Sequence, residues 1–458
     1  MTPIGRNVGT ARRSRRGMMR SVLVVALVTS AAYAGAARAV VTTHAAAADA
    51  TGAAIVGTPG AESTLALEAV LARVLERNPS LEAARAAWRE AKAEARASGV
   101  LADPMLDLMV APRTIGRSDV EAGYRIGITQ PLPLFGQRGP QRREAERERD
   151  AMGYDLGALR LDLVRQARMT YVDYWRVTRA VEANRELAGL LSQFRSVALA
   201  KYAAGLVGQQ DPLQADVELA MRDHVAVMLE RERRVAVAQL NVLMHQPPET
   251  ALPPPAELAL PDTSAMHGDL QARARAQRSE LRAADARVGA GEAGVAGARR
   301  ARLPETSVSA GYDRMWSDVA MRPSVGLALS LPIQFTRLNS AAEAARARLA
   351  RREAERAVVR DRVALEVADA VARFHEQAHD VAITRERLVP LAERALAATR
   401  AGYEANRSDF LALLNASRDL LRARLEADES LAALQLARAD LDRAVGEAPP
   451  NAAEEETR

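Results

Sequence analysis

The sequence predicts a mostly helical protein with a small β part, in which one unit of helix, β-hairpin and long helices occurs twice. Three observations support this fold class. Aromatic residues make up only 3% of the 458 residues, and Ala, Arg, Leu and Glu dominate, which is typical of long packed helices. Two short stretches alternate apolar residues with small or polar ones, as strands do. Anchor residues also recur at a constant spacing, which indicates a duplication.

The duplication is marked by residues that stand out from a background rich in alanine and arginine. The aligned pairs, all 200 or 201 positions apart, are Asn78-Pro79 with Arg278-Ser279, Asp103-Pro104 with Leu303-Pro304, Pro131 with Pro332, Tyr202 with Tyr403, and Leu240-Asn241 with Leu441-Asp442. A chance alignment of Ala/Arg-rich helices would not keep this spacing within one residue over most of the chain. We therefore interpret the chain as two tandem repeats.

Residues 1–39 have the three parts of a signal peptide. Arginines between positions 12 and 20 precede an apolar stretch at 21–32, and small residues offer cleavage sites after Ala34 or Ala39. A membrane anchor is the alternative, but the apolar stretch falls short of the roughly 20 residues that a helical span needs. The Arg15-Arg16 pair also resembles a twin-arginine signal, so the export route stays open. Residues 40–63 are expected to be a flexible N-terminal segment.

Charge and cysteine content exclude several classes of protein. The chain has 63 basic residues, and removal of the seven arginines of the signal leaves 56 against 58 acidic residues. The mature protein is therefore not basic, and no nucleic acid is expected among its partners. The absence of cysteine excludes disulfides, thiolate metal sites and a catalytic thiol.

Repeat 1 is assigned to residues 64–245. A helical pattern covers 65–101, with Pro79 in the first turn of a second helix. A β-hairpin is predicted at about 105–130, where apolar residues alternate: Leu106, Leu108 and Val110, then Tyr124, Ile126 and Ile128. From 137 to 202 apolar residues recur every three or four positions, which predicts a coiled-coil helix roughly 100 Å long at ~1.5 Å per residue. A turn at 205–212 leads into a helix at 216–244.

Repeat 2 is assigned to residues 264–447 and follows the same plan. A proline-rich linker at 246–263 precedes it. Its hairpin is predicted at about 306–331, where the alternating apolar residues are Val308, Ala310 and Tyr312, then Val325, Leu327, Leu329 and Leu331. Helices are predicted at 339–402 and 409–445. The acidic residues 448–458 are expected to form a disordered tail.

One chain supplies only four predicted strands. A transmembrane barrel formed by a single chain uses at least about eight strands, and an open sheet edge cannot face lipid. No apolar run of helix-spanning length follows residue 39. If the strands cross a membrane, they must close with strands of other copies, so the pattern predicts a homo-oligomer whose copy number it does not fix.

The duplicated arrangement resembles the TolC-like outer membrane factor family. The likeness covers roughly residues 65–445 and is carried by the order of elements, by Gln130-Pro131-Leu132-Pro133-Leu134-Phe135-Gly136 at the strand exit, and by Tyr202-Ala203-Ala204-Gly205-Leu206. It implies a homotrimer with a twelve-strand β-barrel in the outer membrane, in contact with its lipid, and an α-helical barrel in the periplasm. It also implies docking on a periplasmic adaptor and, through it, on an inner-membrane pump. Enzymatic activity and cofactors are not expected.

The resemblance also places functional residues. The adaptor-docking tips fall on Ala204, Gly205 and Leu206 in repeat 1, and on Ala405, Asn406 and Arg407 in repeat 2. Glycine suits a tight reversal with positive φ, although Gly205 is equally well explained as an ordinary helix C-cap. Asn406 replaces that glycine in repeat 2 and also tolerates the left-handed conformation.

Many family members narrow the tunnel entrance with carboxylates just after the tip. Asp211 matches this position in repeat 1, whereas repeat 2 has Ala412 and Asn415 there. Arg407 and Asp409 lie close enough to substitute as a salt-bridge gate. Asp409 as a helix N-cap is the alternative.

One stretch fits a metal-binding motif. His375-Glu376-Gln377-Ala378-His379 matches the H-E-x-x-H pattern of zinc peptidases, in which two histidines on one helix face bind zinc and the glutamate acts as a base. The third ligand is missing, because Ala382 and Arg385 stand where one class of these enzymes has glycine and histidine. The preferred interpretation is a solvated helix face, with a peptidase or an adventitious metal contact as alternatives.

The sequence therefore predicts the outer-membrane channel subunit of a tripartite efflux system, which conducts substrate passively to the exterior. Residues 131–138 resemble the heavy-metal, CusC/CzcC-like branch of the family more than the drug branch, which would make metal cations the cargo. Two alternatives stay open. One is a soluble periplasmic coiled-coil adaptor or scaffold, against which the alternating stretches argue, and the other is the outer-membrane component of type I protein secretion.

Overall fold

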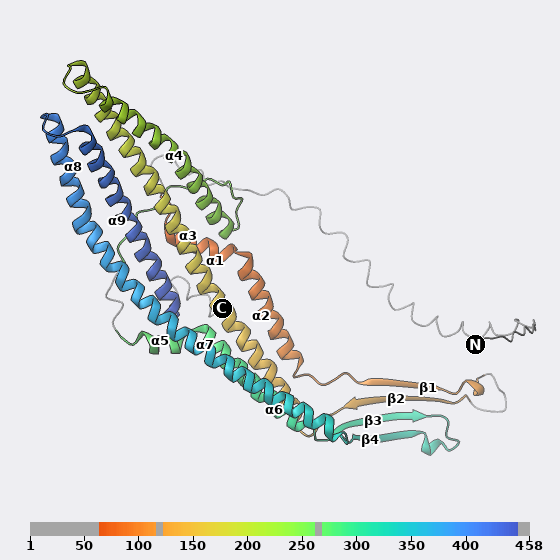
Figure 1. Ribbon diagram of the computed structural model, residues 1–458. Helices are drawn as coiled ribbons and strands as arrows, with labels where there is room; N and C mark the ends of the chain where they lie inside the picture. The colour runs from red at the N-terminus through yellow and green to blue at the C-terminus, as the bar shows by residue number, and fades with distance from the viewer. Residues whose placement is uncertain (1–63, 116–121, 262–267, 448–458) are drawn as a thin grey trace, which may run out of the picture. The chain divides into compact units, whose positions relative to one another are not determined.

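The computed structural model describes residues 64–115, 122–261 and 268–447. These residues belong to one compact unit and are mostly helical with one four-stranded sheet, which confirms the predicted fold class (Figure 1). The expected signal peptide, the segment 40–63 and the acidic tail 448–458 lie outside the described residues. Within the described ranges, no helix combines the length and the apolar character that a membrane crossing requires.

Repeat 1 begins with two short helices that meet at a proline. Pro79 stands at the start of α2, where a missing N–H costs nothing, and Asn78 caps this helix by accepting from the Ser80 N–H at 3.0 Å. α3 runs for 66 residues, about 100 Å at ~1.5 Å per residue. The elements are α1 (Leu67–Arg77), α2 (Pro79–Ala97), β1 (Met105–Val110), the 3-10 turn η1 (Pro112–Thr114), β2 (Tyr124–Pro131), α3 (Arg138–Ala203) and α4 (Gln210–Leu243).

Repeat 2 has the same order of elements, except that a π-helical turn divides its long helix. They are α5 (Leu270–Gln277), α6 (Ser279–Arg300), β3 (Glu305–Asp313), the 3-10 turn η3 (Val319–Met321), β4 (Pro323–Ser330), α7 (Phe335–Ile383), the π-helical turn η4 (Thr384–Leu388), α8 (Val389–Glu404) and α9 (Phe410–Val445). In Figure 1 the four strands lie at one end of the long helices, and the turns α3–α4 and α8–α9 lie at the other.

The long helix of repeat 2 differs from the single helix that the sequence predicts at 339–402. It starts earlier, at Phe335, and η4 interrupts it just before Pro390. Proline lacks an N–H and its ring crowds the carbonyl four residues earlier, so the backbone widens locally. The Thr384 hydroxyl stabilises the wider turn, because it donates to the Asp380 carbonyl at 2.8 Å and lies 2.9 Å from the Ser430 hydroxyl of α9.

The two hairpins join into one antiparallel sheet with the order β1-β2-β3-β4. β2 of repeat 1 pairs with β3 of repeat 2, so the sheet connects the repeats. The register aligns Leu108 with Ile126 and Val308 with Leu327, which brings the alternating apolar residues of all four strands to one face. The predicted alternation is confirmed, except that Leu331 lies just beyond β4. β1 and β4 are the outer strands, and neither has a further strand partner among the described residues.

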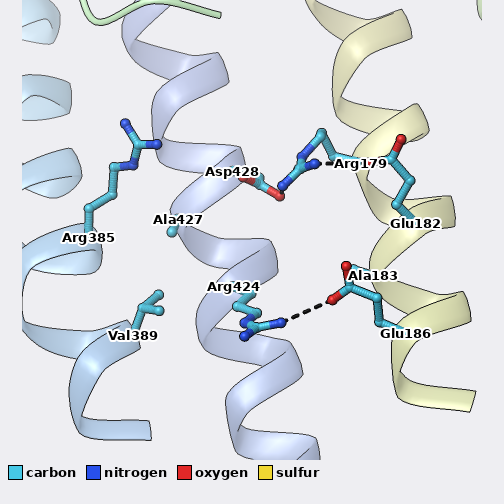
Figure 2. Close-up of a pocket in the computed structure, with 9 residues that line it drawn as sticks. All are labelled: Arg179, Glu182, Ala183, Glu186, Arg385, Val389, Arg424, Ala427 and Asp428. Carbon is cyan, nitrogen blue, oxygen red and sulfur yellow. Dashed lines mark hydrogen bonds and ion pairs between the residues drawn. The ribbon is translucent and has the colours of Figure 1, made fainter. Parts of the chain in front are cut away.

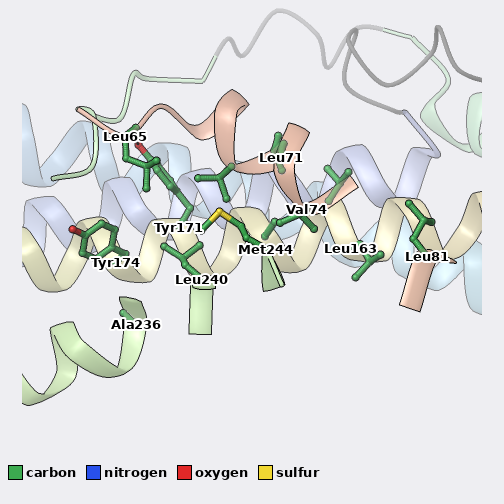
Figure 3. Packing of buried hydrophobic residues seen from close by; sticks show 13 residues of the cluster. Leu65, Leu71, Val74, Leu81, Leu163, Tyr171, Tyr174, Ala236, Leu240 and Met244 are labelled. Atoms are coloured by element: carbon green, nitrogen blue, oxygen red, sulfur yellow. Dashed lines mark hydrogen bonds between the residues drawn. The ribbon is translucent and has the colours of Figure 1, made fainter. Parts of the chain in front are cut away.

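A hydrophobic core joins the short helices of repeat 1 to its long ones (Figure 3). Val70 and Val74 of α1 pack with Tyr171 of α3 and with Leu240 and Met244 at the end of α4. Tyr171 also donates to the Leu65 carbonyl at 2.7 Å, which anchors the chain before α1. The predicted coiled-coil seam of α3 is confirmed, since its positions are buried or half-buried from Leu156 to Leu191.

In each repeat, the junction between the two short helices is hydrogen-bonded to the end of the last helix. In repeat 1, Asn78 Nδ2 donates to the Leu243 carbonyl at 3.0 Å. At the equivalent position of repeat 2, Arg278 is fully buried and donates to the Arg443 and Ala444 carbonyls at 3.1 and 3.0 Å. Arg278 also pairs with Glu280 at 2.9 Å. Burial disfavours the charged form of Glu280 and so tends to raise its pKa. Arg278 and Arg443 outweigh this effect and hold the pKa below the ordinary value.

Candidate functional site: the paired helix turns

The turn between α3 and α4 is built by a glycine in the left-handed conformation. Gly205 has a φ of +70°, its N–H donates to the Tyr202 carbonyl, and the Leu206 N–H donates to the Lys201 carbonyl, both at 2.9 Å. These two bonds form a Schellman motif, which satisfies the free carbonyls at a helix end. A larger residue at 205 would be strained by this φ although nothing lies within 4 Å of its position.

The turn between α8 and α9 repeats this geometry with a different residue. Asn406 has a φ of 57°, its N–H donates to the Tyr403 carbonyl at 3.2 Å, and the Arg407 N–H donates to the Gly402 carbonyl at 2.7 Å. Asparagine can adopt this conformation because its short polar side chain finds local hydrogen bonds. The six residues predicted as docking tips, Ala204 to Leu206 and Ala405 to Arg407, are all exposed.

Side chains join the two turns to each other. Lys201, near the end of α3, donates to the Tyr403 carbonyl and to Asn406 Oδ1, the latter at 2.7 Å, and its ammonium lies 4.2 Å from the centre of the Tyr403 ring. The Tyr403 hydroxyl donates to Asp211 Oδ2 at 3.2 Å. Burial, and then the charge of Asp211, raise the pKa of the Tyr403 hydroxyl. The hydroxyl therefore stays protonated and remains a donor throughout the physiological pH range.

The structure places the three predicted gate residues in different surroundings. Asp211 is buried between the turns, against Tyr403 of the other repeat. Asp409 caps α9, because its carboxylate accepts from the Ala412 N–H at 2.8 Å. Arg407 is exposed, and no ion pair joins it to Asp409 in the described part of the chain. Asp409 thus has the capping geometry of the alternative interpretation, and its role as a gate remains a prediction.

Sequence reasoning missed Lys201 and the role of Tyr403 at this site. Alignment of the repeats marks Tyr403 as the counterpart of Tyr202, but not as a buried residue. Its contacts cross from one repeat to the other, and a comparison of the repeats cannot show that. A second such contact lies further along the helices, where Arg418 of α9 donates to the buried Glu218 of α4.

The zinc-type motif lies on the surface of α7. His375, Glu376 and His379 are exposed. Within the described residues, no three or more side chains of His, Cys, Asp or Glu come together in a group that could hold a metal ion. The arrangement supplies two histidines on one helix and no third ligand, which a catalytic zinc site needs.

A charged groove of about 240 Å³ lies where α3, α9 and the π-turn region meet (Figure 2). Arg179 of α3 lies 3.6 Å from the Asp428 carboxylate of α9, and Arg424 of α9 lies 3.0 Å from Glu186 of α3. Burial raises the pKa of Asp428, although Arg179 acts in the opposite direction. Both ion pairs join α3 of repeat 1 to α9 of repeat 2, but exposed ion pairs of this kind contribute little to stability.

The outer membrane efflux protein family model matches residues 70–244 and 270–447, one match in each repeat. Among solved structures, the chain is similar to CusC (TM-score 0.73, 17% identity, covering 83% of this chain and 92% of that one). It is also similar to VceC of Vibrio cholerae (TM-score 0.69, 20% identity, 83% and 96%) and to MtrE of Neisseria gonorrhoeae (TM-score 0.69, 18% identity, 83% and 89%). At these identities the likeness concerns the fold. No curated protein sequence matches the chain.

Proposed function

Because the chain belongs to the outer membrane efflux protein family, we propose that it is the outer-membrane channel subunit of a tripartite efflux system. In this role it conducts substrate passively from a periplasmic adaptor and an inner-membrane pump to the exterior. The observation that carries the proposal is the four-stranded sheet. It has two outer strands that lack a partner among the described residues, and one apolar face that is exposed.

The sheet cannot be stable in a membrane as a single copy. Its apolar face includes Leu106 of β1 and Val325 of β4, whose exposed fractions are 74% and 85%. Such a face suits lipid, but the unpaired N–H and C=O groups of β1 and β4 do not. Pairing of β1 in one copy with β4 in the next would satisfy both edges. Three copies would give a barrel of twelve strands, with the polar face of the sheet toward the lumen.

The helices support the same assembly. α4 packs on α3, α3 on α9, and α9 on α7 and α8, so α4 and the α7–α8 pair lie on the outside. α4 carries exposed apolar residues seven positions apart, at Met221, Met228, Val235 and Val242. α7 carries Val358 and Leu365 with the same spacing. Apolar residues at this spacing form the contact stripe of coiled coils, so neighbouring copies would close the helices into a barrel in the periplasm.

The paired turns are the surface proposed for the adaptor. They are the exposed end of the helices farthest from the strands, and their backbone is fixed by the left-handed Gly205 and Asn406. Asp211, Arg407 and Asp409 remain the proposed gate residues. Of these, only Asp211 bonds across the two turns, to Tyr403. We also propose metal cations as cargo, on the resemblance of residues 131–138 to the heavy-metal branch. Unchanged metal tolerance in a deletion strain would argue against that cargo.

Introduced cysteines can test the assembly, because the natural chain has none. We expect Leu108→Cys on β1 combined with Leu327→Cys on β4 to form disulfides between copies in outer-membrane fractions. Val325→Cys provides a second position on β4, two residues before Leu327 and on the same face of the sheet. On denaturing gels the ladder should end at three subunits. Each single variant is the matched control, since a closed ring joins β1 to β4 and never β1 to β1. Equal cross-linking of single and double variants, or release of the protein with soluble periplasmic proteins, would contradict the channel.

A further inference from the structure

We propose that the four strand–helix junctions form a collar that binds anionic phospholipid headgroups. The junctions are α2–β1, β2–α3, α6–β3 and β4–α7. The inference rests on the proposed function, because it requires the strands to cross a membrane. Its partner is the phospholipid leaflet on the side of the helices.

The junctions lie together in space. Arg138 of α3 donates to the Gly99 carbonyl after α2, and Gln137 Nε2 donates to the Leu303 carbonyl before β3 at 2.9 Å. Arg302 donates to Asn339 of α7 at 2.8 Å, which adds the fourth junction. The segments at which the chain passes from strand to helix, in both repeats, therefore form one continuous surface.

Strand length places this surface at the membrane boundary. The strands have six to nine residues, whereas a tilted strand needs about 9–11 residues to cross a bilayer. The hydrocarbon region must therefore extend to the strand ends. The junctions expose large apolar side chains there, as a membrane boundary requires: Val100, Leu134, Phe135, Leu331, Ile333 and Phe335.

The charge beside these apolar residues is the second part of the argument. Among the described residues, the hydrogen bonds of Arg138, Arg300 and Arg302 go to neutral oxygens, those of Gly99, Gly136 and Asn339. Arg299 and Arg337 are exposed and have no ion pair or hydrogen bond within the described ranges.

Within three residues of the same junctions there are three acidic residues, Asp103, Asp107 and Glu305, and none is paired with an arginine in the described part of the chain. The positive charge is therefore in excess.

A phospholipid fits both parts of this arrangement, the arginines and the exposed apolar side chains. Arginine binds phosphate oxygens with two parallel hydrogen bonds, and the exposed apolar side chains reach the acyl boundary beneath the headgroups. A shallow cavity of about 240 Å³ between the α6–β3 and β4–α7 junctions is lined by Leu331, Ile333 and Arg337, and also by Glu305. It places one arginine beside apolar side chains, and the excess of positive charge comes from the arginines around it. Anionic headgroups should bind better than zwitterionic ones, because only they gain from the excess positive charge.

The test compares lipids on the purified full chain in detergent. We expect phosphatidylglycerol to raise the thermal midpoint of the oligomer more than phosphatidylcholine does at the same mole fraction. Arg299→Gln with Arg337→Gln should lower the affinity for phosphatidylglycerol about 30-fold, which corresponds to about 1 kcal/mol for each arginine. These two side chains have no partner in the described residues, so the change removes charge without removing a contact. Arg299→Lys with Arg337→Lys should retain most of the preference.

The matched control removes the same charge elsewhere. Arg360→Gln with Arg394→Gln alters two exposed arginines of the long helices that also lack partners among the described residues, and it should leave the lipid preference unchanged. Glycerol phosphate in solution distinguishes a headgroup in a membrane from free phosphate, and should not reproduce the effect. The collar proposal is wrong if Arg299→Gln with Arg337→Gln keeps the preference for phosphatidylglycerol, or if the control variant loses it to the same extent. If the natural chain neither oligomerises nor enters membranes, the proposed channel fails instead.

Discussion

Tyr202 and Tyr403 occupy equivalent positions in the two repeats, but their side chains have opposite surroundings. Tyr202 is 45% exposed, whereas Tyr403 is 3% exposed and donates to the buried Asp211. A buried carboxylate is costly unless hydrogen bonds compensate for lost water. No other hydrogen bond to the Asp211 carboxylate occurs among the described residues, so Tyr403 stabilises the only acidic side chain held between the two turns.

We expect Tyr403→Phe to loosen both turns, because it leaves the Asp211 carboxylate buried without a donor. The free energy of local opening should fall by about 1–3 kcal/mol. Amide hydrogen exchange of residues 201–213 and 403–412 measures this directly. Tyr202→Phe is the matched control, since it removes an exposed hydroxyl and should change stability by less than about 0.5 kcal/mol. If both variants exchange alike, the hydrogen bond to Asp211 does not hold the turns.

At the scale of elements, the long helices of the two repeats lead into similar turns, but they differ in continuity and in capping. α3 is continuous over 66 residues, whereas its counterpart contains the π-turn η4 ahead of Pro390. α9 begins with the Asp409 cap, whereas α4 has no side-chain cap. The start of α9 therefore depends on one carboxylate that sequence reasoning also considered as a gate.

Substitutions at Asp409 can separate these two roles. Asparagine keeps an oxygen that caps a helix, whereas alanine does not. As a cap, Asp409→Ala should cost about 0.5–2 kcal/mol of stability, and Asp409→Asn should cost only part of that. As a gate, both substitutions should change single-channel conductance equally, because both remove the charge. Thermal midpoints and conductance of the two variants decide between these patterns, and an Asp409→Ala variant as stable as the natural chain would show that the cap does not stabilise α9.

At the scale of the whole molecule, one copy leaves apolar surface open both on its sheet and on its helices. The outer strands have no further strand partner among the described residues, and the apolar stripe of α4 is exposed. A row of exposed apolar residues along one helix face is typical of contact with another protein surface.

We expect Met228→Glu with Val235→Glu to prevent assembly, because charges on this stripe would be buried between copies without partners. Both positions are exposed in the single chain, so its own fold should change little. Met228→Leu with Val235→Leu keeps the stripe apolar and should assemble normally. Light scattering of the detergent-solubilised protein gives the number of subunits. A stable oligomer from the glutamate variant would show that α4 does not contact a neighbouring copy.

The sequence by itself determined the repeats, the helical class, the four strands and the positions of the two turns. These features depend on local patterns, namely proline at helix starts, the strand period of two, and spacings of three and four along helices. The predicted strands agree with β1 to β4 to within a few residues. Asn406 was likewise identified as a residue able to replace glycine, and it adopts the left-handed conformation.

Only the tertiary structure decided which side chains meet. The bond of Tyr403 to Asp211, the reach of Lys201 across the turns, and the buried Arg278 all join segments that are distant along the chain. Asp409 was ambiguous in sequence because capping and gating use the same carboxylate; the local bond from the Ala412 N–H shows the cap, and the gate remains a prediction. Local periodicity fixes which face of a helix is apolar. It does not fix which residues two packed helices bring opposite each other, because that depends on how both repeats sit in one fold.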